Sequence, residues 1–243
     1  MPINPVLMSA YQTIKNDPIP LIQTLTDLEK EYIGLPFGGE RETFYYRIRE
    51  TYNGMRIGDD QKIPFFIFLN HTCFNGLYRE NKNGMFNVPH GKYKDPQIFD
   101  IDNINMLHEA LQKVEICCED FGYVFTRPLS QHTFIYFDPP YRPISKQMSM
   151  FTQYDKSGFS DADQLRLKEI CDICTNQGHK LMLSNSDSYD DDVSYFENLY
   201  NNNYNIERIK VTRMINPYNA KDRKPNEVII TNYSTQESII DII

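Results

Sequence analysis

The pattern of apolar and polar positions predicts helices in the first half of the chain. Residues 5–30 have a helical pattern that breaks near Asp17-Pro18, because proline cannot continue a helix. Residues 44–50 fit either a helix or a strand, residues 63–70 form a buried apolar segment, and residues 103–113 predict a short helix. The intervening stretches are rich in Gly, Pro and Asn, which is typical of loops.

The second half of the chain predicts strands that alternate with a helix. The expected strands are residues 114–118, 132–137 and 180–183, followed by a closing hairpin of residues 206–214 and 227–232. Between them, residues 160–177 form the clearest helix, with Ser160 as N-cap, Asp163 three residues later and Gly178 as the stop. Strands that alternate with helices indicate an α/β fold.

Composition suggests that residues 52–100 form a separate insert, because they are rich in loops, aromatic residues and basic residues. The main domain would then comprise residues 1–51 and 101–243. The net charge is −8, yet basic residues outnumber acidic ones within residues 61–94 and 205–225. Two basic patches on an acidic body fit a protein with one defined anionic groove, and equally fit two solvated loops.

Several classes of protein are not indicated. The longest apolar run, residues 63–69, is too short to cross a membrane, and the N-terminus does not resemble a signal peptide, so we expect a cytoplasmic protein without a membrane partner. The five cysteines favour a reducing compartment. Cys171 and Cys174 form a CxxC inside a helical pattern, which indicates two core residues and no metal site.

The strongest chemical signal is Asp138-Pro139-Pro140-Tyr141, directly after the strand expected at residues 132–137. Ligands of α/β sheets bind beyond the carboxyl ends of strands. The prolines lack N–H groups, so their carbonyls and the Asp138 carboxylate remain as acceptors for an exocyclic amine, and Tyr141 offers a face on which a base can stack. The same four residues could also form an ordinary turn.

Such acceptors would make an aromatic amine more nucleophilic. Its lone pair is delocalised into the ring, and accepting both of its hydrogens favours a localised lone pair that can attack an electrophilic methyl group. Alignment and electrostatics would dominate this catalysis. An adenine would have to be flipped out of the duplex to reach the turn.

Several motifs occur in an order that resembles the Dam-type adenine-N6 DNA methyltransferases of the alpha class. They are Phe74-Asn75-Gly76-Leu77-Tyr78-Arg79, Phe86-Asn87-Val88-Pro89, Gly91-Lys92-Tyr93, Asp138-Pro139-Pro140-Tyr141, Phe151-Thr152-Gln153-Tyr154, Leu183-Ser184-Asn185-Ser186-Asp187 and the closing hairpin. The resemblance covers nearly the whole chain. It implies a Rossmann-like methyltransferase sheet with a small helical, loop-rich DNA-recognition insert, S-adenosylmethionine as methyl donor, and double-stranded DNA as partner.

The resemblance also implies roles for individual residues. Asp138, Pro139, Pro140 and Tyr141 would form the catalytic turn that holds the flipped adenine, with Asp138 also near the methionine part of the cofactor. Asp120 and Phe121 would meet the adenine of the cofactor. By their places in the motifs, Asn75, Leu77, Arg79 and Pro89 would approach bases, Phe74 would insert into the base stack, and Lys92, Tyr93 and Arg213 would contact phosphates. Without the resemblance, Asp120 and Phe121 would be taken for a surface carboxylate and a core aromatic.

The chain departs from the family pattern at its N-terminus. It has no Trp, so a Trp-containing first segment is not found, and Met1-Pro2 stand where an acidic residue is expected before Ile3-Asn4-Pro5. Phe37-Gly38-Gly39 resembles the glycine-rich cofactor loop but lies in the wrong order and is interpreted as a turn. The sheet is therefore expected to be incomplete, which invites self-association or completion by a separate N-terminal polypeptide.

These features leave three functions open. The first is site-specific adenine-N6 methylation of DNA, with GATC as the first expectation for the site and with restriction–modification or housekeeping as its context. The second is a truncated, inactive DNA-binding remnant, or one half of a split methyltransferase. The third, methylation of RNA or of a protein amide, is disfavoured by the motifs between residues 74 and 93.

Overall fold

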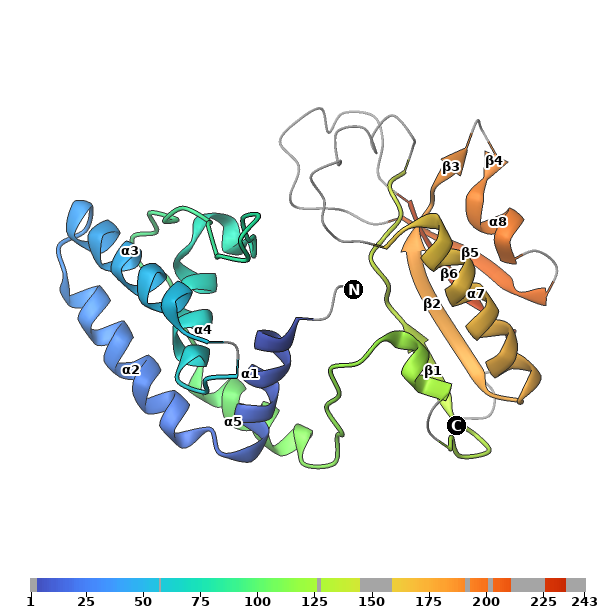
Figure 1. Ribbon diagram of the computed structural model, residues 1–243, viewed down its shortest axis with the longest axis horizontal. Helices are drawn as coiled ribbons and strands as arrows, with labels where there is room; N and C mark the ends of the chain where they lie inside the picture. The colour runs from blue at the N-terminus through green and yellow to red at the C-terminus, as the bar shows by residue number, and fades with distance from the viewer. Residues whose placement is uncertain are drawn as a thin grey trace. The chain divides into compact units, whose positions relative to one another are not determined.

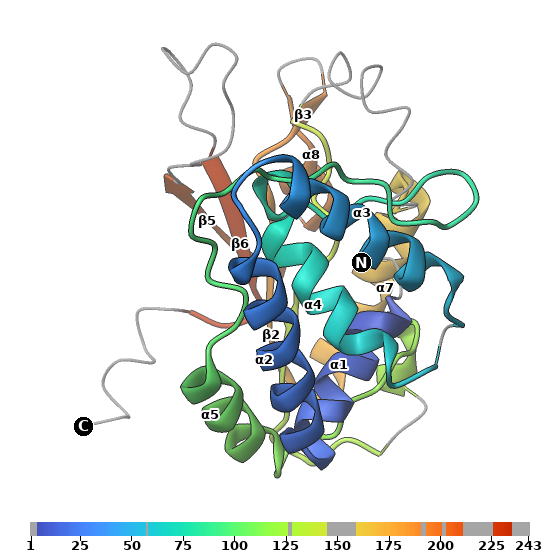
Figure 2. The ribbon, with the colours of Figure 1, turned by 90° about the vertical axis from the view of Figure 1, so that its left-hand side faces the viewer.

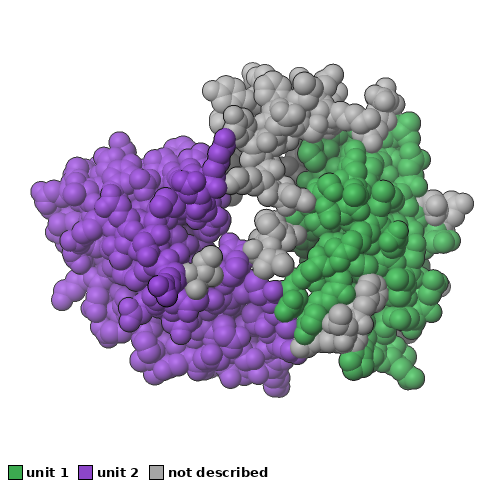
Figure 3. Space-filling model, viewed as in Figure 1, with its two compact units in different colours: residues 1–3, 119–243 green, residues 4–118 purple. Residues whose placement is uncertain are grey.

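The chain folds into two compact units, which Figure 3 shows in different colours. The computed structural model describes residues 4–56, 58–125, 128–144, 159–190, 193–200, 203–210 and 226–234. Residues 4–118 form a unit that we call the helical unit, and residues 119–243 form the α/β unit. The α/β class expected from the sequence is confirmed by the second unit.

The helical unit contains α1 (Pro5–Asn16), α2 (Ile19–Gly34), α3 (Gly39–Gly54), α4 (Lys62–Thr72), the short 3-10 helix η1 (Phe74–Gly76) and α5 (Ile101–Leu111) (Figure 1). The expected break at Asp17-Pro18 is confirmed. Residues 44–50 lie within α3, so the helical alternative holds there, and the apolar segment 63–70 is part of α4. Phe37 and Gly38 form a turn, with Gly38 at φ 119°, and Gly39 is the first residue of α3.

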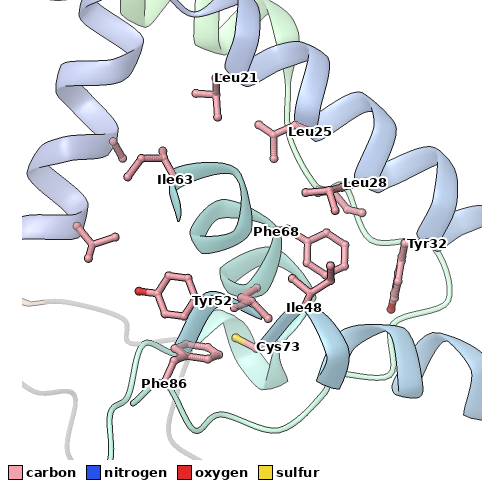
Figure 4. Packing of buried hydrophobic residues seen from close by; sticks show 14 of the residues in the cluster. Leu21, Leu25, Leu28, Tyr32, Ile48, Tyr52, Ile63, Phe68, Cys73 and Phe86 are labelled. Atoms are coloured by element: carbon pink, nitrogen blue, oxygen red, sulfur yellow. The ribbon is translucent and has the colours of Figure 1, made fainter. Parts of the chain in front are cut away.

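Helix α4 is the central element of the helical unit, since it packs against α1, α2 and α3 (Figure 2). Its Ile63, Phe68 and Leu69 are almost completely buried, and they share one core with Leu25 and Tyr32 of α2 (Figure 4). Residues from the segment 52–100, such as Tyr52, Phe86 and Val88, belong to this same core. The segment expected to read DNA is therefore built into a larger helical unit.

The α/β unit contains η2 (Phe121–Phe125), β1 (Phe134–Phe137), α7 (Asp161–Asn176), β2 (Lys180–Ser186), β3 (Tyr189–Asp190), β4 (Val193–Ser194), α8 (Tyr195–Tyr200), β5 (Asn205–Lys210) and β6 (Asn226–Thr231). Four strands form a sheet in the order β1-β2-β6-β5, with β1 parallel to β2 and the other pairs antiparallel. Helix α7 connects β1 to β2 and packs along β2 (Figure 1). This arrangement is a β-α-β unit closed by an antiparallel hairpin.

Most strands appear where the sequence predicts them, with one exception. The strands at 132–137 and 180–183 and the closing hairpin are confirmed, although residues 211–214 lie outside the described part of the chain. The strand expected at 114–118 is wrong. There the Val114 amide donates to the Leu111 carbonyl at the end of α5, and the Val114 carbonyl accepts from Lys15 Nζ of α1, so both backbone groups of Val114 have partners outside any sheet.

Helix α7 confirms both its predicted cap and its core residues. Ser160 and Asp163 form a reciprocal capping box at its start. Cys171 and Cys174 are completely buried in the core of the α/β unit, and burial raises the pKa of the Cys171 thiol to about 12. Across the described part of the chain, no helix has the length and apolar character needed to span a membrane.

Candidate active site

The turn of Asp138, Pro139, Pro140 and Tyr141 lies at the carboxyl end of β1, as expected from the sequence. Strands β1 and β2 are parallel, and Phe137 pairs with Leu183, so the turn begins beside Ser184. The Asp138 side chain is exposed, whereas Pro139 is buried and Tyr141 is half-buried. A buried proline thus holds a carboxylate at the edge of the sheet where α/β proteins bind ligands.

A chain of hydrogen bonds orients the Asp138 carboxylate. Ser184 Oγ lies 3.1 Å from Asp138 Oδ1 and 2.9 Å from the Tyr136 hydroxyl. Since a carboxylate only accepts, the single Ser184 proton goes to Asp138, and Tyr136 must donate to Ser184. Ser184 is 3% exposed, so the hydroxyl in the middle of this link is shielded from water. It leaves the second oxygen of Asp138 for a ligand.

Tyr141 is held from strand β6, which lies on the far side of β2 from β1. Its hydroxyl donates to Glu227 Oε2 at 3.4 Å, and Glu227 stands opposite Ser186 in the register of β2 and β6. Burial raises the pKa of the Tyr141 hydroxyl, so it stays protonated and acts as a donor at neutral pH. The ring is therefore fixed at the same edge of the sheet as Asp138.

Arg142 fastens the end of the turn to β2 and α7. Its backbone N–H donates to Asn185 Oδ1 at 2.9 Å, and its carbonyl accepts from the Ser186 hydroxyl. Its guanidinium pairs with Asp161 at 2.8 Å and lies 3.9 Å from the centre of the Tyr195 ring. The turn is thus held by backbone and side-chain contacts on both sides.

We expect Ser184→Ala to slow the methyl transfer that the resemblance implies about tenfold, because the Asp138 carboxylate loses its orienting donor. Tyr136→Phe removes only the outer link and should lower the rate by about threefold. Steady-state kinetics with duplex DNA would measure both. Ser184→Thr keeps the hydroxyl, so a kcat higher than that of Ser184→Ala would show that the loss comes from the missing hydrogen bond and not from altered packing. An unchanged kcat in Ser184→Ala would contradict the role of the link.

Asp120 and Phe121 lie together at the start of η2 and make contacts with α7. Arg166 forms an ion pair with Asp120, with Nη1 3.1 Å from Oδ2, and lies 4.4 Å from the centre of the Phe121 ring. The Arg166 hydrogen bond, assisted by the Gly122 N–H, lowers the pKa of the Asp120 carboxyl. Asp120 therefore keeps its charge, and its direction is fixed by Arg166. Its proposed contact with a cofactor remains a prediction.

The residues expected to contact DNA lie mainly in the loop of residues 73–93 of the helical unit, which we call the recognition loop. Its two sides pair through the bridges Cys73–His90 and Glu80–Phe86. Side chains of α3 anchor the returning side: Tyr45 donates to the Val88 carbonyl at 2.8 Å, and Asn53 exchanges two hydrogen bonds with the Phe86 backbone. Hydrogen bonds from side chains of α3 thus fix the returning side of the loop.

The recognition loop brings several of the predicted DNA-binding residues together. The Phe74 amide donates to the Pro89 carbonyl at 2.9 Å, and the Asn75 amide donates to the Tyr93 hydroxyl at 2.9 Å. Asn75 has a left-handed backbone (φ 54°) that helps to turn the chain there. The predicted contact residues of this loop are all exposed: Phe74, Asn75, Leu77, Arg79, Pro89, Lys92 and Tyr93. Arg213 and the motif at 151–154 lie outside the described residues.

Gly91 allows the two sides of the recognition loop to approach closely. A Cβ at this position would lie 2.6 Å from the Cys73 carbonyl oxygen and would collide with the Tyr93 ring. We expect Gly91→Ala to destabilise the protein by about 1–3 kcal/mol and to weaken duplex binding about tenfold, because the loop must shift. Thermal denaturation and fluorescence anisotropy would measure these effects.

The matched control for Gly91 is Gly39→Ala, at the start of α3. A Cβ on Gly39 would meet nothing within 4 Å, and its backbone is not left-handed. The stability and the duplex binding of Gly39→Ala should therefore stay close to those of the parent protein. A Gly91→Ala variant that behaved like this control would show that the loop tolerates the shift.

Sequence reasoning missed several residues that shape the site. Ser184 and Asn185 were noted only as a strand end, and Asn87 only as part of a motif, although each hydrogen-bonds a predicted site residue or its immediate neighbour. Glu227 was noted only as the start of an expected strand, and Arg142 was not singled out. The motif around Asn185 was a signal that this strand end belongs to the site. Its hydrogen bond to Arg142 could not be predicted, because it depends on the register between β1 and β2.

The comparison with known proteins identifies the family of the chain. The family model for D12 class N6 adenine-specific DNA methyltransferases matches residues 3–215. The chain is 43% identical to the type II methyltransferase M.MjaIII of Methanocaldococcus jannaschii, over 95% of this chain and 78% of that protein. It is 31% identical to the retron Ec67 DNA adenine methylase of Escherichia coli, over 93% of this chain and 73% of that protein.

A third relative is the DNA adenine methylase of Vibrio cholerae, which is 31% identical over 93% of this chain and 76% of its own length. A methyltransferase of the α/β type that acts on adenine in DNA is therefore the class that the fold and the similarities define. The chain belongs to the D12 class of N6 adenine-specific DNA methyltransferases.

Proposed function

We propose that this chain transfers a methyl group from S-adenosylmethionine to N6 of an adenine flipped out of duplex DNA, and that GATC is the site. The observation that supports this most directly is the Asp138 carboxylate, exposed at the carboxyl end of β1 and oriented there by Ser184. Tyr141, fixed by Glu227, would stack on the flipped base.

The residues present fit the adenine end of S-adenosylmethionine. The Asp120 carboxylate is an acceptor for an exocyclic amine, and Arg166 fixes its direction, while Phe121 adds apolar surface beside it. The cofactor supplies an electrophilic methyl group on a positively charged sulfur. Asp138, which the family resemblance assigns to the methionine part of the cofactor, would stabilise that charge as well as accept from the target amine.

The transfer itself follows from the acceptors of the turn. Asp138 and the proline carbonyls accept the N6 hydrogens and aim the lone pair away from the ring. When bound, S-adenosylmethionine would supply the methyl carbon to the N6 lone pair, and its sulfur would keep the electron pair of the broken carbon–sulfur bond. One N6 proton then leaves through the Asp138 carboxylate to solvent.

The test is a methylation assay with radiolabelled S-adenosylmethionine and matched duplexes that contain GATC, GTAC or GAATTC. We expect label in N6-methyladenine of the GATC duplex alone, identified by mass spectrometry of the nucleosides. Label at another site would overturn GATC and keep the adenine chemistry. Label in GATC duplexes without N6-methyladenine would overturn the reaction.

The same assay distinguishes the alternative of a DNA-binding module. That alternative predicts salt-dependent duplex binding without saturable S-adenosylmethionine binding in calorimetric titration. The chain is tested for completion by a second polypeptide if it neither binds S-adenosylmethionine nor transfers the methyl group. The part of M.MjaIII that lies outside the match is then added to the assay. Recovered transfer would support a split enzyme, and continued inactivity would argue against it.

A further inference from the structure

Arg79 and Asn87 face each other across the recognition loop. Arg79 Nε donates to Asn87 Oδ1 at 2.8 Å, and Arg79 Nη2 donates to the Asn87 carbonyl at 3.3 Å. The Asn87 amide in turn donates to the Arg79 carbonyl at 3.0 Å. Asn87 therefore accepts two hydrogen bonds from the Arg79 guanidinium and donates one to the Arg79 backbone.

This contact uses one particular edge of the guanidinium. The group has five N–H donors, and the Nε–Nη2 side is the edge that Asn87 occupies. The Nη1–Nη2 edge keeps two parallel donors. That pair of donors matches the O6 and N7 acceptors that guanine presents in the major groove.

The surroundings also leave the charge of Arg79 available. The neighbouring carboxylate, Glu80, accepts a hydrogen bond from the Tyr78 hydroxyl. Among the residues that the structure describes, Arg79 makes no ion pair, and its partner Asn87 is neutral. Arg79 is exposed, so its free edge can reach a ligand.

We propose that Asn87 is a specificity-determining positioning residue, which holds Arg79 so that its Nη1–Nη2 edge reads the O6 and N7 of a guanine in the target site. This inference rests on the proposed function, in which Arg79 contacts a base. Fixing the guanidinium before binding reduces the flexibility that is lost in the complex. It also restricts the arginine to one orientation, and a freely rotating side chain would read several bases equally.

The test combines protein variants with a modified base in the duplex that the methylation assay identifies. Replacing its guanine by 7-deazaguanine removes only the N7 acceptor. We expect the parent protein to bind this duplex about tenfold more weakly, as measured by fluorescence anisotropy. In Asn87→Ala the penalty should fall to about threefold or less, because the freed guanidinium no longer selects N7.

Asn87→Asp separates positioning from charge. Its carboxylate can accept on the same Nε–Nη2 edge, so the penalty for 7-deazaguanine should persist, while overall affinity falls because the charge of Arg79 is neutralised. Asn83→Ala, on the same loop, is the matched control and should behave like the parent. The Asp variant also keeps the test decisive if Asn87→Ala fails to fold, since loss of base discrimination in a folded Asn87→Asp would overturn the proposal.

Two outcomes separate this inference from the proposed function. If Arg79→Ala keeps the full penalty for 7-deazaguanine, Arg79 does not read that base, and the proposed role of the loop fails. If Arg79→Ala removes the penalty and Asn87→Ala keeps it, the loop reads guanine without help from Asn87, and only the present inference is overturned.

Discussion

Asp138→Ala is expected to lower the rate of methyl transfer about 100- to 1,000-fold while leaving duplex binding within about threefold of the parent. The carboxylate is exposed, so its removal should disturb the fold little. The loss falls on the transition state, because the N6 amine then lacks the acceptor that aligns its lone pair. Single-turnover transfer from labelled cofactor measures the chemical step directly.

Asp138→Asn is the stricter version of this test. The amide keeps the size of the carboxylate and can still accept from Ser184, but it has no negative charge and one side of it is a donor. We expect a loss close to that of the alanine variant. Glu169→Ala, on the exposed side of α7, is the matched control for removing a carboxylate from the same unit. A variant of Asp138 that kept more than a tenth of the parent rate would contradict the assigned role.

The position of the turn formed by Asp138, Pro139, Pro140 and Tyr141 could be predicted because its signals are local. The strand before Asp138 is apolar and rich in β-forming residues, and the two prolines mark its end within the same few positions. The capping box of Ser160 and Asp163 is equally local, and it is confirmed. Features that depend on a few consecutive residues were therefore read correctly.

The failures concern features that depend on distant partners. Residues 114–118 have the composition of a strand, but composition carries no information on whether another strand stands beside them. The link between Ser184 and Asp138 requires the parallel register of β1 and β2, which join residues 46 positions apart. The same limit applies to Arg79 and Asn87, whose contact follows from how the recognition loop folds back on α3.

The ambiguous segment 44–50 shows how tertiary packing decides a marginal pattern. Phe44, Tyr45, Ile48 and Tyr52 are all buried in the helical core. Their spacing places all four along one side of a helix, which can pack against α4, whereas a strand would put Tyr45 on the face opposite the other three. The aromatic residues favour strands by intrinsic preference, and the available core overrides that preference.

The second large effect is expected for Arg41 of α3, which is only 7% exposed. Its guanidinium donates to three carbonyls: Ile33 at 2.8 Å, Leu35 at 3.0 Å and Lys94 at 2.8 Å. The first two carbonyls lie at the C-terminal end of α2, where helices leave acceptors without intrahelical partners. The third follows the recognition loop, so a single side chain joins the end of a helix to that loop.

We expect Arg41→Met to lower the free energy of unfolding by about 3–5 kcal/mol, since it removes a buried charge-assisted network and leaves three acceptors with one donor fewer each. Urea denaturation followed by circular dichroism would measure the change. Arg47→Met, on the same helix, is the matched control. Arg47 pairs with Glu31 at 2.6 Å, but its side chain is 61% exposed, and such surface pairs contribute at most about 1 kcal/mol.

The comparison between these two arginines also bears on function. Because Arg41 holds the Lys94 carbonyl, its loss should loosen the end of the recognition loop and weaken duplex binding, even at temperatures where the protein stays folded. Arg47→Met should leave binding unchanged. Equal stability of the two variants would mean that water replaces the guanidinium at the three carbonyls, and that the end of α2 does not depend on Arg41.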